Sequence, residues 1–178
     1  MVNGGVVMGF DKIMGFKTLP SGANVKTRTA VRGVIFHEGK LLMILTNKGD
    51  YKFPGGGMKQ GESVEETLSR EVLEETGYQV QDVLGTLGTV LQQQIDDKDD
   101  SMYFSMNSIY IGCTIKDCRP FDQQLDDYEE EQAFLARFVT VQEAIKQNEK
   151  VLKENKSGRN DWVERETFVL KELLQVAR

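Results

Sequence analysis

Residues 54–78 read PGGGMKQGESVEETLSREVLEETGY, and this stretch decides the fold class and the chemistry that we expect. We expect the glycines Gly55–Gly57 to form a loop, because glycine runs disfavour regular structure. Ser63 with Glu66 three residues later is the pattern of a helix capping box, and Gly77 is typical of the residue that ends a helix. The stretch therefore predicts a glycine loop followed by a capped helix.

On either side of this stretch, the chain alternates between residues typical of strands and of helices. We predict strands at Thr27–Phe36, Leu41–Thr46, Lys52–Phe53, Val80–Leu91, Met102–Ile115 and Ala133–Val139, acidic loops at Asp96–Asp100 and Asp122–Glu131, and helices at Val141–Asn148 and Trp162–Val176. This mixture indicates an α/β or α+β fold with a mixed sheet. We predict a single domain over residues 25–178, and residues 1–24 as a loosely attached N-terminal extension containing a short hairpin.

The composition narrows the class of protein. The chain has 178 residues with 28 acids and 22 basic residues, a net charge of −6, which suits one globular domain and disfavours duplex nucleic acid as a partner. Its longest aliphatic run, Leu41–Leu45, is far shorter than the roughly 20 residues of a membrane helix, so we expect no membrane partner. The two cysteines, Cys113 and Cys118, form no disulfide framework or metal-site spacing, and no signal peptide is recognisable. We therefore expect a cytoplasmic protein.

The predicted helix carries a group of carboxylates. At about 100° per residue, Glu71, Glu74 and Glu75 fall within roughly 100° of arc, next to the apolar stripe of Val64, Leu68 and Val72. A solvated, glutamate-rich helix face would explain them by itself. The glycine loop before the helix favours a metal site instead, because its carbonyls can complete an oxygen shell that suits Mg²⁺ or Mn²⁺.

The same residues resemble the Nudix box. Gly56 is followed by Glu62, then by Arg70-Glu71, Val72, Glu74-Glu75 and Gly77 at the spacing of that family, and only Tyr78 departs from the pattern, at its final aliphatic position. The resemblance implies an α/β/α sandwich and the hydrolysis of a pyrophosphate bond in a nucleoside diphosphate derivative with a divalent metal.

The resemblance also implies roles for individual residues. Glu71, Glu74 and Glu75 would hold Mg²⁺ together with the Gly55 carbonyl, and Arg70 and Glu62 would orient them. Glu71 is the first candidate for the base that accepts a proton from water. Because the position of this base varies in the family, Glu129, Glu130 and Glu131 are further candidates for a base or a metal ligand, and a solvated acidic loop is the alternative.

Several smaller signals leave alternatives open. Lys26, Arg28 and Arg32 share one face of a predicted strand, where they either bind substrate phosphates or form a solvated surface. Candidates for contact with a nucleobase are Tyr51, Phe53 and Tyr103, whereas we expect Trp162 and Phe168 to pack the C-terminal helix.

The expected partner is a small nucleotide-derived substrate, and the N-terminal segment is a candidate contact in a homodimer. The alternative function is that of a non-catalytic Nudix-like module that binds a nucleotide and regulates a partner. Such modules usually lose glutamates of the box, and this chain keeps them.

Overall fold

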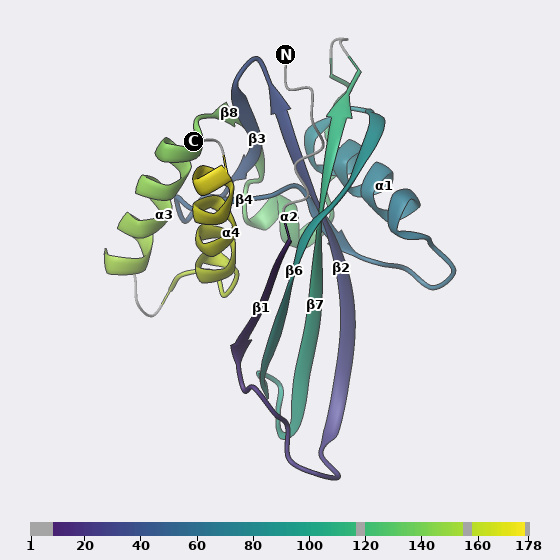
Figure 1. Cartoon of the computed structure of the whole chain (residues 1–178), viewed down its shortest axis with the longest axis vertical. Helices are drawn as coiled ribbons and strands as arrows, with labels where there is room; N and C mark the ends of the chain where they lie inside the picture. Colours follow the sequence, from purple (N-terminus) through teal and green to yellow (C-terminus); the bar gives the residue numbers. More distant parts are fainter. Residues whose placement is uncertain (1–8, 117–119, 155–157, 177–178) are drawn as a thin grey trace.

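The computed structural model describes residues 9–116, 120–154 and 158–176. Its elements follow the order β1 (Phe10–Gly15), β2 (Asn24–His37), β3 (Lys40–Leu45), β4 (Tyr51–Lys52), β5 (Gly55–Gly57), α1 (Val64–Thr76), β6 (Val80–Asp96), β7 (Asp99–Ile115), α2 (Asp127–Glu131), β8 (Leu135–Val139), α3 (Val141–Glu154) and α4 (Val163–Val176). Figure 1 shows α1 on one side of the sheet and the pair α3 and α4 on the other. The α/β/α sandwich with a mixed sheet is confirmed.

The sheet runs in the order β1-β6-β7-β2-β3-β4, with β5 paired to β2 and β8 paired to β3. Strand β2 runs parallel to β7, which is antiparallel to β6. The long strands β2, β6 and β7 extend well beyond the helices as a ribbon, as Figure 1 shows at its lower end. This ribbon forms one side of the site described below.

Two apolar clusters hold the three layers together. On the α1 face, Leu68 and Val72 pack against Val31 and Ile35 of β2. On the other face, Leu170 and Leu173 of α4 belong to a cluster with Tyr110 of β7. Burial of these side chains fixes α1 and α4 on opposite faces of β2 and β7, because each helix has one apolar stripe to cover.

Several elements differ from the sequence-based expectation. The glycines Gly55–Gly57, predicted as loop, form β5, whose residues pair with Ala30–Arg32 of β2. The acidic loop predicted at Asp96–Asp100 is a tight connection, because β6 continues to Asp96 and β7 begins at Asp99. Within the second predicted acidic loop, residues 127–131 form the short helix α2.

The N-terminal segment also differs. Residues 10–15 form β1, which pairs in parallel with β6 rather than folding into a hairpin of its own. Phe10 is buried and packs edge-to-face on Tyr110 and Phe168. The strand therefore contributes to the core beneath α4. A separate extension over residues 1–24 stays a prediction, and residues 1–8 lie outside the described part of the chain.

Candidate active site

The glycine strand β5 lies directly against β2. Gly55 has a φ of 141°, and a Cβ atom at this residue would lie 2.9 Å from the Arg32 Cα, so only glycine fits. Its carbonyl accepts hydrogen bonds from the Arg32 guanidinium and, at 3.4 Å, from Lys52 Nζ. The backbone entering the strand is held as well, because the Phe53 N–H donates to Glu166 Oε2 at 3.0 Å.

Helix α1 starts and ends where the sequence predicts. Ser63 and Glu66 form the capping box, and Gly77 ends the helix in the left-handed conformation with its N–H bonded to the Leu73 carbonyl. This register turns two of the predicted glutamates toward β5: Glu71 is 7% exposed and Glu75 is 1% exposed. The prediction that the carboxylates lie against the buried side of the helix is confirmed for this pair.

Glu75 is held between a cation and the glycine strand. Its Oε1 lies 2.5 Å from Lys52 Nζ, and its Oε2 accepts the Gly55 N–H at 2.9 Å. Burial raises the pKa of the Glu75 carboxyl to about 7, and Lys52 opposes that rise. Burial likewise lowers the pKa of the Lys52 ammonium, which also lies 4.4 Å from the centre of the Phe134 ring. Lys52 is not among the predicted site residues, because its only signal in the sequence is its position in a short extended segment before a proline.

Arg70 organises the other carboxylates. It donates to both oxygens of Glu62, at 2.6 and 2.8 Å, to Glu71 Oε1 at 2.6 Å and to the Gly57 carbonyl at 3.2 Å. It also reaches Glu74 Oε2 at 3.1 Å. One guanidinium therefore ties the box residue Glu62 and the glycine strand to Glu71.

A third carboxylate comes from a distant part of the chain. Ligand oxygens of Glu71, Glu75 and Glu129 lie within 4.8 Å of one another, and we call these residues the carboxylate cluster. Glu129 is held by a capping box in which its Oε2 accepts the Asp126 N–H at 3.0 Å, and burial raises its pKa. Glu74 is not part of the cluster.

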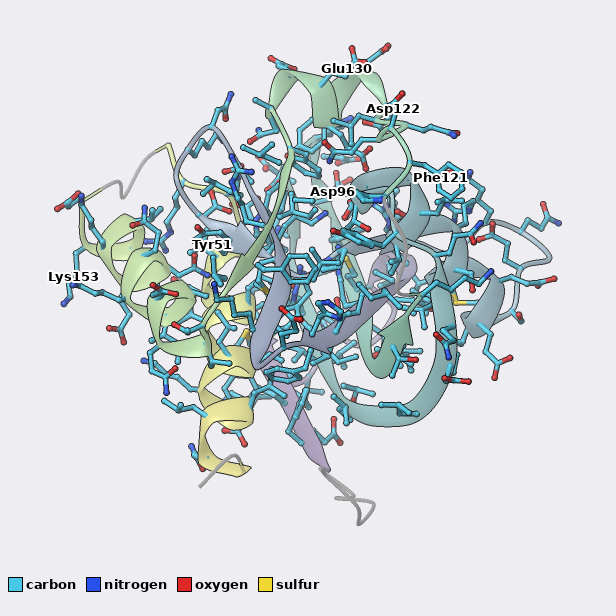
Figure 2. All side chains as sticks on the ribbon, turned by 90° about the horizontal axis from the view of Figure 1, so that it is seen from above. Tyr51, Asp96, Phe121, Asp122, Glu130 and Lys153 are labelled. Atoms are coloured by element: carbon cyan, nitrogen blue, oxygen red, sulfur yellow. The ribbon has the colours of Figure 1, made fainter. Side chains whose placement is uncertain are left out.

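The structure separates the acidic residues that the sequence left as alternatives. Glu130 and Glu131, the neighbours of Glu129, are exposed, and Figure 2 shows Glu130 at the outer edge of α2. Only Glu129 of this group lines the cavity beside β5.

The carboxylate cluster opens into a cavity of about 450 Å³. Its walls come from β2, β4, β5, β6, β7, α1, α2 and α4 and from the segments beside them. The aromatic side chains that line it are Phe104, Tyr128, Phe134 and Trp162. None of the predicted nucleobase contacts lies among its lining residues. Phe53 is fully buried, Tyr103 packs on Phe16, and Tyr51 lies beside α3 (Figure 2), where its N–H donates to Asn148.

The cavity also changes the interpretation of Trp162, but not that of Phe168. Phe168 packs in the core, as predicted, whereas Trp162 lines the cavity and donates from Nε1 to Asp50 Oδ2 at 2.8 Å. The ring of Trp162 stands edge-to-face to that of Tyr128. The helical spacing of Trp162 with Val169 and Leu173 predicts helix packing, but Trp162 lies just before α4, which begins at Val163.

A comparison with models of protein families tests the resemblance to the Nudix box. The model of the NUDIX domain matches residues 26–163. The chain belongs to the Nudix family. It is therefore a hydrolase of the class that acts on phosphoanhydride bonds.

Solved structures of Nudix proteins share the fold. A NUDIX hydrolase from Nitrosomonas europaea is 20% identical, with a TM-score of 0.57, and the match covers 86% of this chain and 92% of that one. A UDP-X diphosphatase is 20% identical with a TM-score of 0.50, covering 89% and 68%. An ADP compounds hydrolase is 19% identical with a TM-score of 0.50, covering 83% and 71%. No curated protein matches the chain in sequence.

Two further features of this Nudix chain follow from its described residues. Cys113 is buried, and burial raises the pKa of its thiol to about 12, so the thiol stays protonated at neutral pH. Cys118 lies outside the described residues. Within residues 9–116, 120–154 and 158–176, the helices are too short or too polar to cross a bilayer.

Proposed function

We propose that this Nudix hydrolase uses Mg²⁺ or Mn²⁺ to cleave a pyrophosphate bond in a nucleoside diphosphate derivative, in which a group X is attached to the second phosphate. The products are a nucleoside monophosphate and the phosphorylated group, P-X. The observation that carries the proposal is the carboxylate cluster at the edge of the cavity, with ligand oxygens of three carboxylates within 4.8 Å. Lys52 and Arg70 offset the charges of Glu75 and Glu71, but no ion pair offsets that of Glu129 within the described residues, and a divalent cation would neutralise the repulsion that is left.

The donor set fits a hard divalent cation. Glu71, Glu75 and Glu129 offer carboxylate oxygens, the ligands that Mg²⁺ and Mn²⁺ prefer. We propose these residues as the principal ligands. Glu74 and the Gly55 carbonyl are outer candidates, because Glu74 lies outside the carboxylate cluster and the Gly55 carbonyl already accepts bonds from Arg32 and Lys52. A bound metal would supply charge neutralisation at the phosphate and lower the pKa of a water molecule.

The residues around the cluster position the reacting groups. Arg70 holds Glu71 from one side through a 2.6 Å bond, which orients the carboxylate toward the cavity. We propose that Glu71 accepts the proton of the attacking water, as oxygen–phosphorus bond formation on one side accompanies cleavage of the anhydride bond on the other. Arg70 acts through Glu71 in this proposal, and Lys52 holds Glu75 in the same way.

The cavity supports a substrate of nucleotide size. Its volume of about 450 Å³, its aromatic side chains and its cations suit a base, a sugar and phosphates. Two proteins of the same fold are named for reactions of this type, on UDP-X and on ADP compounds. The cytoplasmic location, the homodimer and the absence of duplex nucleic acid among the partners stay predictions.

The test compares two adjacent glutamates of α2. Glu129→Gln removes a charge from the carboxylate cluster but keeps an amide that can maintain the capping box, and Glu130→Gln is the matched exposed control. With Mg²⁺ and a panel of nucleoside diphosphate derivatives, we expect Glu129→Gln to lower the turnover by about 100-fold or more, and Glu130→Gln to leave it unchanged.

Mn²⁺ binding gives a second readout. Calorimetric titration of the wild type with Mn²⁺ should show a site that Glu129→Gln weakens and Glu130→Gln retains. Equal Mn²⁺ affinity in both variants would remove Glu129 from the metal site. If nucleotides bind but none on the panel is cleaved, the non-catalytic module is the better description.

A further inference from the structure

The cavity that contains the carboxylate cluster is also lined by arginines. Arg28 and Arg32 of β2 and Arg165 of α4 all line it. Arg165 already has partners: it donates to the Tyr110 hydroxyl and to Glu166, at 3.0 and 2.6 Å. The two arginines of β2 have no such carboxylate partner, since the ion pairs of the described residues include neither of them.

Arg32 is a buried cation without a counter-ion. It is 8% exposed, and its Nη1 donates to the Gly55 carbonyl. Its Nε is buried without any hydrogen-bond partner within the described parts of the chain. The nearby acids are engaged, Glu75 with Lys52 and Glu166 with Arg165. A buried charge left in this way is costly unless an anion completes its environment.

Arg28 lies on the same face of β2, four residues before Arg32, with the fully buried Ala30 between them. Its guanidinium lies against the backbone of Gly57. The approach is so close that a Cβ atom at that glycine would come within 2.6 Å of both Nε and Nη2 of Arg28. Glycine at this position therefore lets the guanidinium rest beside β5. The arginines flank the glycine strand, Arg32 at Gly55 and Arg28 at Gly57.

We propose that Arg28 and Arg32 form an anion subsite that binds a phosphate of the substrate beside the carboxylate cluster. The planar fork of arginine suits two phosphate oxygens at once, and the free Nε of Arg32 supplies a donor that the protein itself leaves unused. The identification of the anion as part of a diphosphate rests on the proposed function. The binding of phosphate by the subsite does not rest on it. Lys26 shares the strand face but does not line the cavity, so it lies outside the subsite.

The test uses inorganic pyrophosphate as the probe, in EDTA, so that no metal takes part. Trp162 is the single tryptophan of the chain and lines the cavity, so its fluorescence reports binding there, and calorimetry measures the same affinity independently. Arg28→Ala is the principal variant, because this side chain is exposed and its loss leaves the core intact. Lys26→Ala is the matched control, with the same change of charge on the same face of the same strand.

We expect the wild type and Lys26→Ala to bind pyrophosphate alike, Arg28→Ala to bind about tenfold more weakly or worse, and Arg28→Lys to fall between them because it keeps the charge without the fork. Equal affinity in Arg28→Ala and Lys26→Ala, or no binding to the wild type at millimolar concentration, would overturn the subsite. If Arg28 controls pyrophosphate affinity while no nucleotide derivative is hydrolysed, the subsite stands and the proposed function fails. If nucleotide derivatives are hydrolysed but the affinity for pyrophosphate does not depend on Arg28, the proposed function stands and the subsite fails.

Discussion

Glu166 is the buried acid on which the position of β5 depends, and its removal has a predictable cost. The side chain is fully buried. Its Oε2 accepts the Phe53 N–H, and its Oε1 accepts bonds from the Tyr110 hydroxyl at 3.2 Å and from Arg165 at 2.6 and 2.9 Å. The variant Glu166→Gln keeps the volume but removes the charge, and it places an amide NH₂ where only donors surround it.

The cost follows from the charge that is left behind. Arg165 is 1% exposed and would remain in the core with Gln92 and Tyr110 as its partners but without an anion. Breaking a buried ion pair by removing one partner costs about 3–5 kcal/mol. For a chain of this size, that loss lowers the melting temperature by roughly 6–20 °C.

Urea unfolding followed by circular dichroism measures this loss, and α4 provides the control. Glu164 lies two residues earlier and pairs with Arg159 at 2.6 Å, but its side chain is 61% exposed. Glu164→Gln should therefore cost about 1 kcal/mol or less. If the free energies of unfolding of the two variants agree within 1 kcal/mol, burial does not set the strength of the Arg165–Glu166 pair, and the reasoning is wrong.

Two further predictions concern α1. The hydrogen bonds from Arg70 hold the pKa of Glu62 well below its ordinary value of 4.5, so the stabilisation by Glu62 is present above that pH and is lost as the pH falls below it. Urea titrations at several pH values should show a weaker pH dependence for Glu62→Gln, and an unchanged dependence would contradict the pairing. Gly77→Ala should destabilise the protein by more than 1 kcal/mol, because φ is 76° and the new Cβ would lie 3.0 Å from the Phe121 carbonyl carbon. Gly39→Ala, with the same φ but open space, should cost less, and equal losses would show that the contact is unimportant.

The sequence predicted most where the signals are local. The capping box of Ser63 and Glu66 and the terminating Gly77 are contacts within one helical turn, and the structure has them as expected. The departure at Tyr78 is accommodated in the core, since its ring packs against Phe138 beside the apolar cluster of Leu68 and Val72.

The strand formed by Gly55–Gly57 could not be predicted in the same way. Strands are recognised from alternating side chains, and glycines have none to alternate. Pairing with β2 stabilises this segment, together with the bonds that Arg32 and Lys52 donate to the Gly55 carbonyl. Strand β1 was missed for a similar reason, because its partner β6 lies about 80 residues away in the sequence and parallel pairing leaves no turn signal between them.

The sequence by itself determined the family, the capped helix and the glutamates that the helix turns toward the cavity, because these depend on spacings of a few residues. Only the tertiary structure decided which distant groups join them. It brings Glu129 to Glu71 and Glu75, sets Lys52 against Glu75, and seats Phe53 on Glu166, 113 residues later. Such contacts depend on how the helices pack across the sheet, and one sequence carries no local signal for that packing.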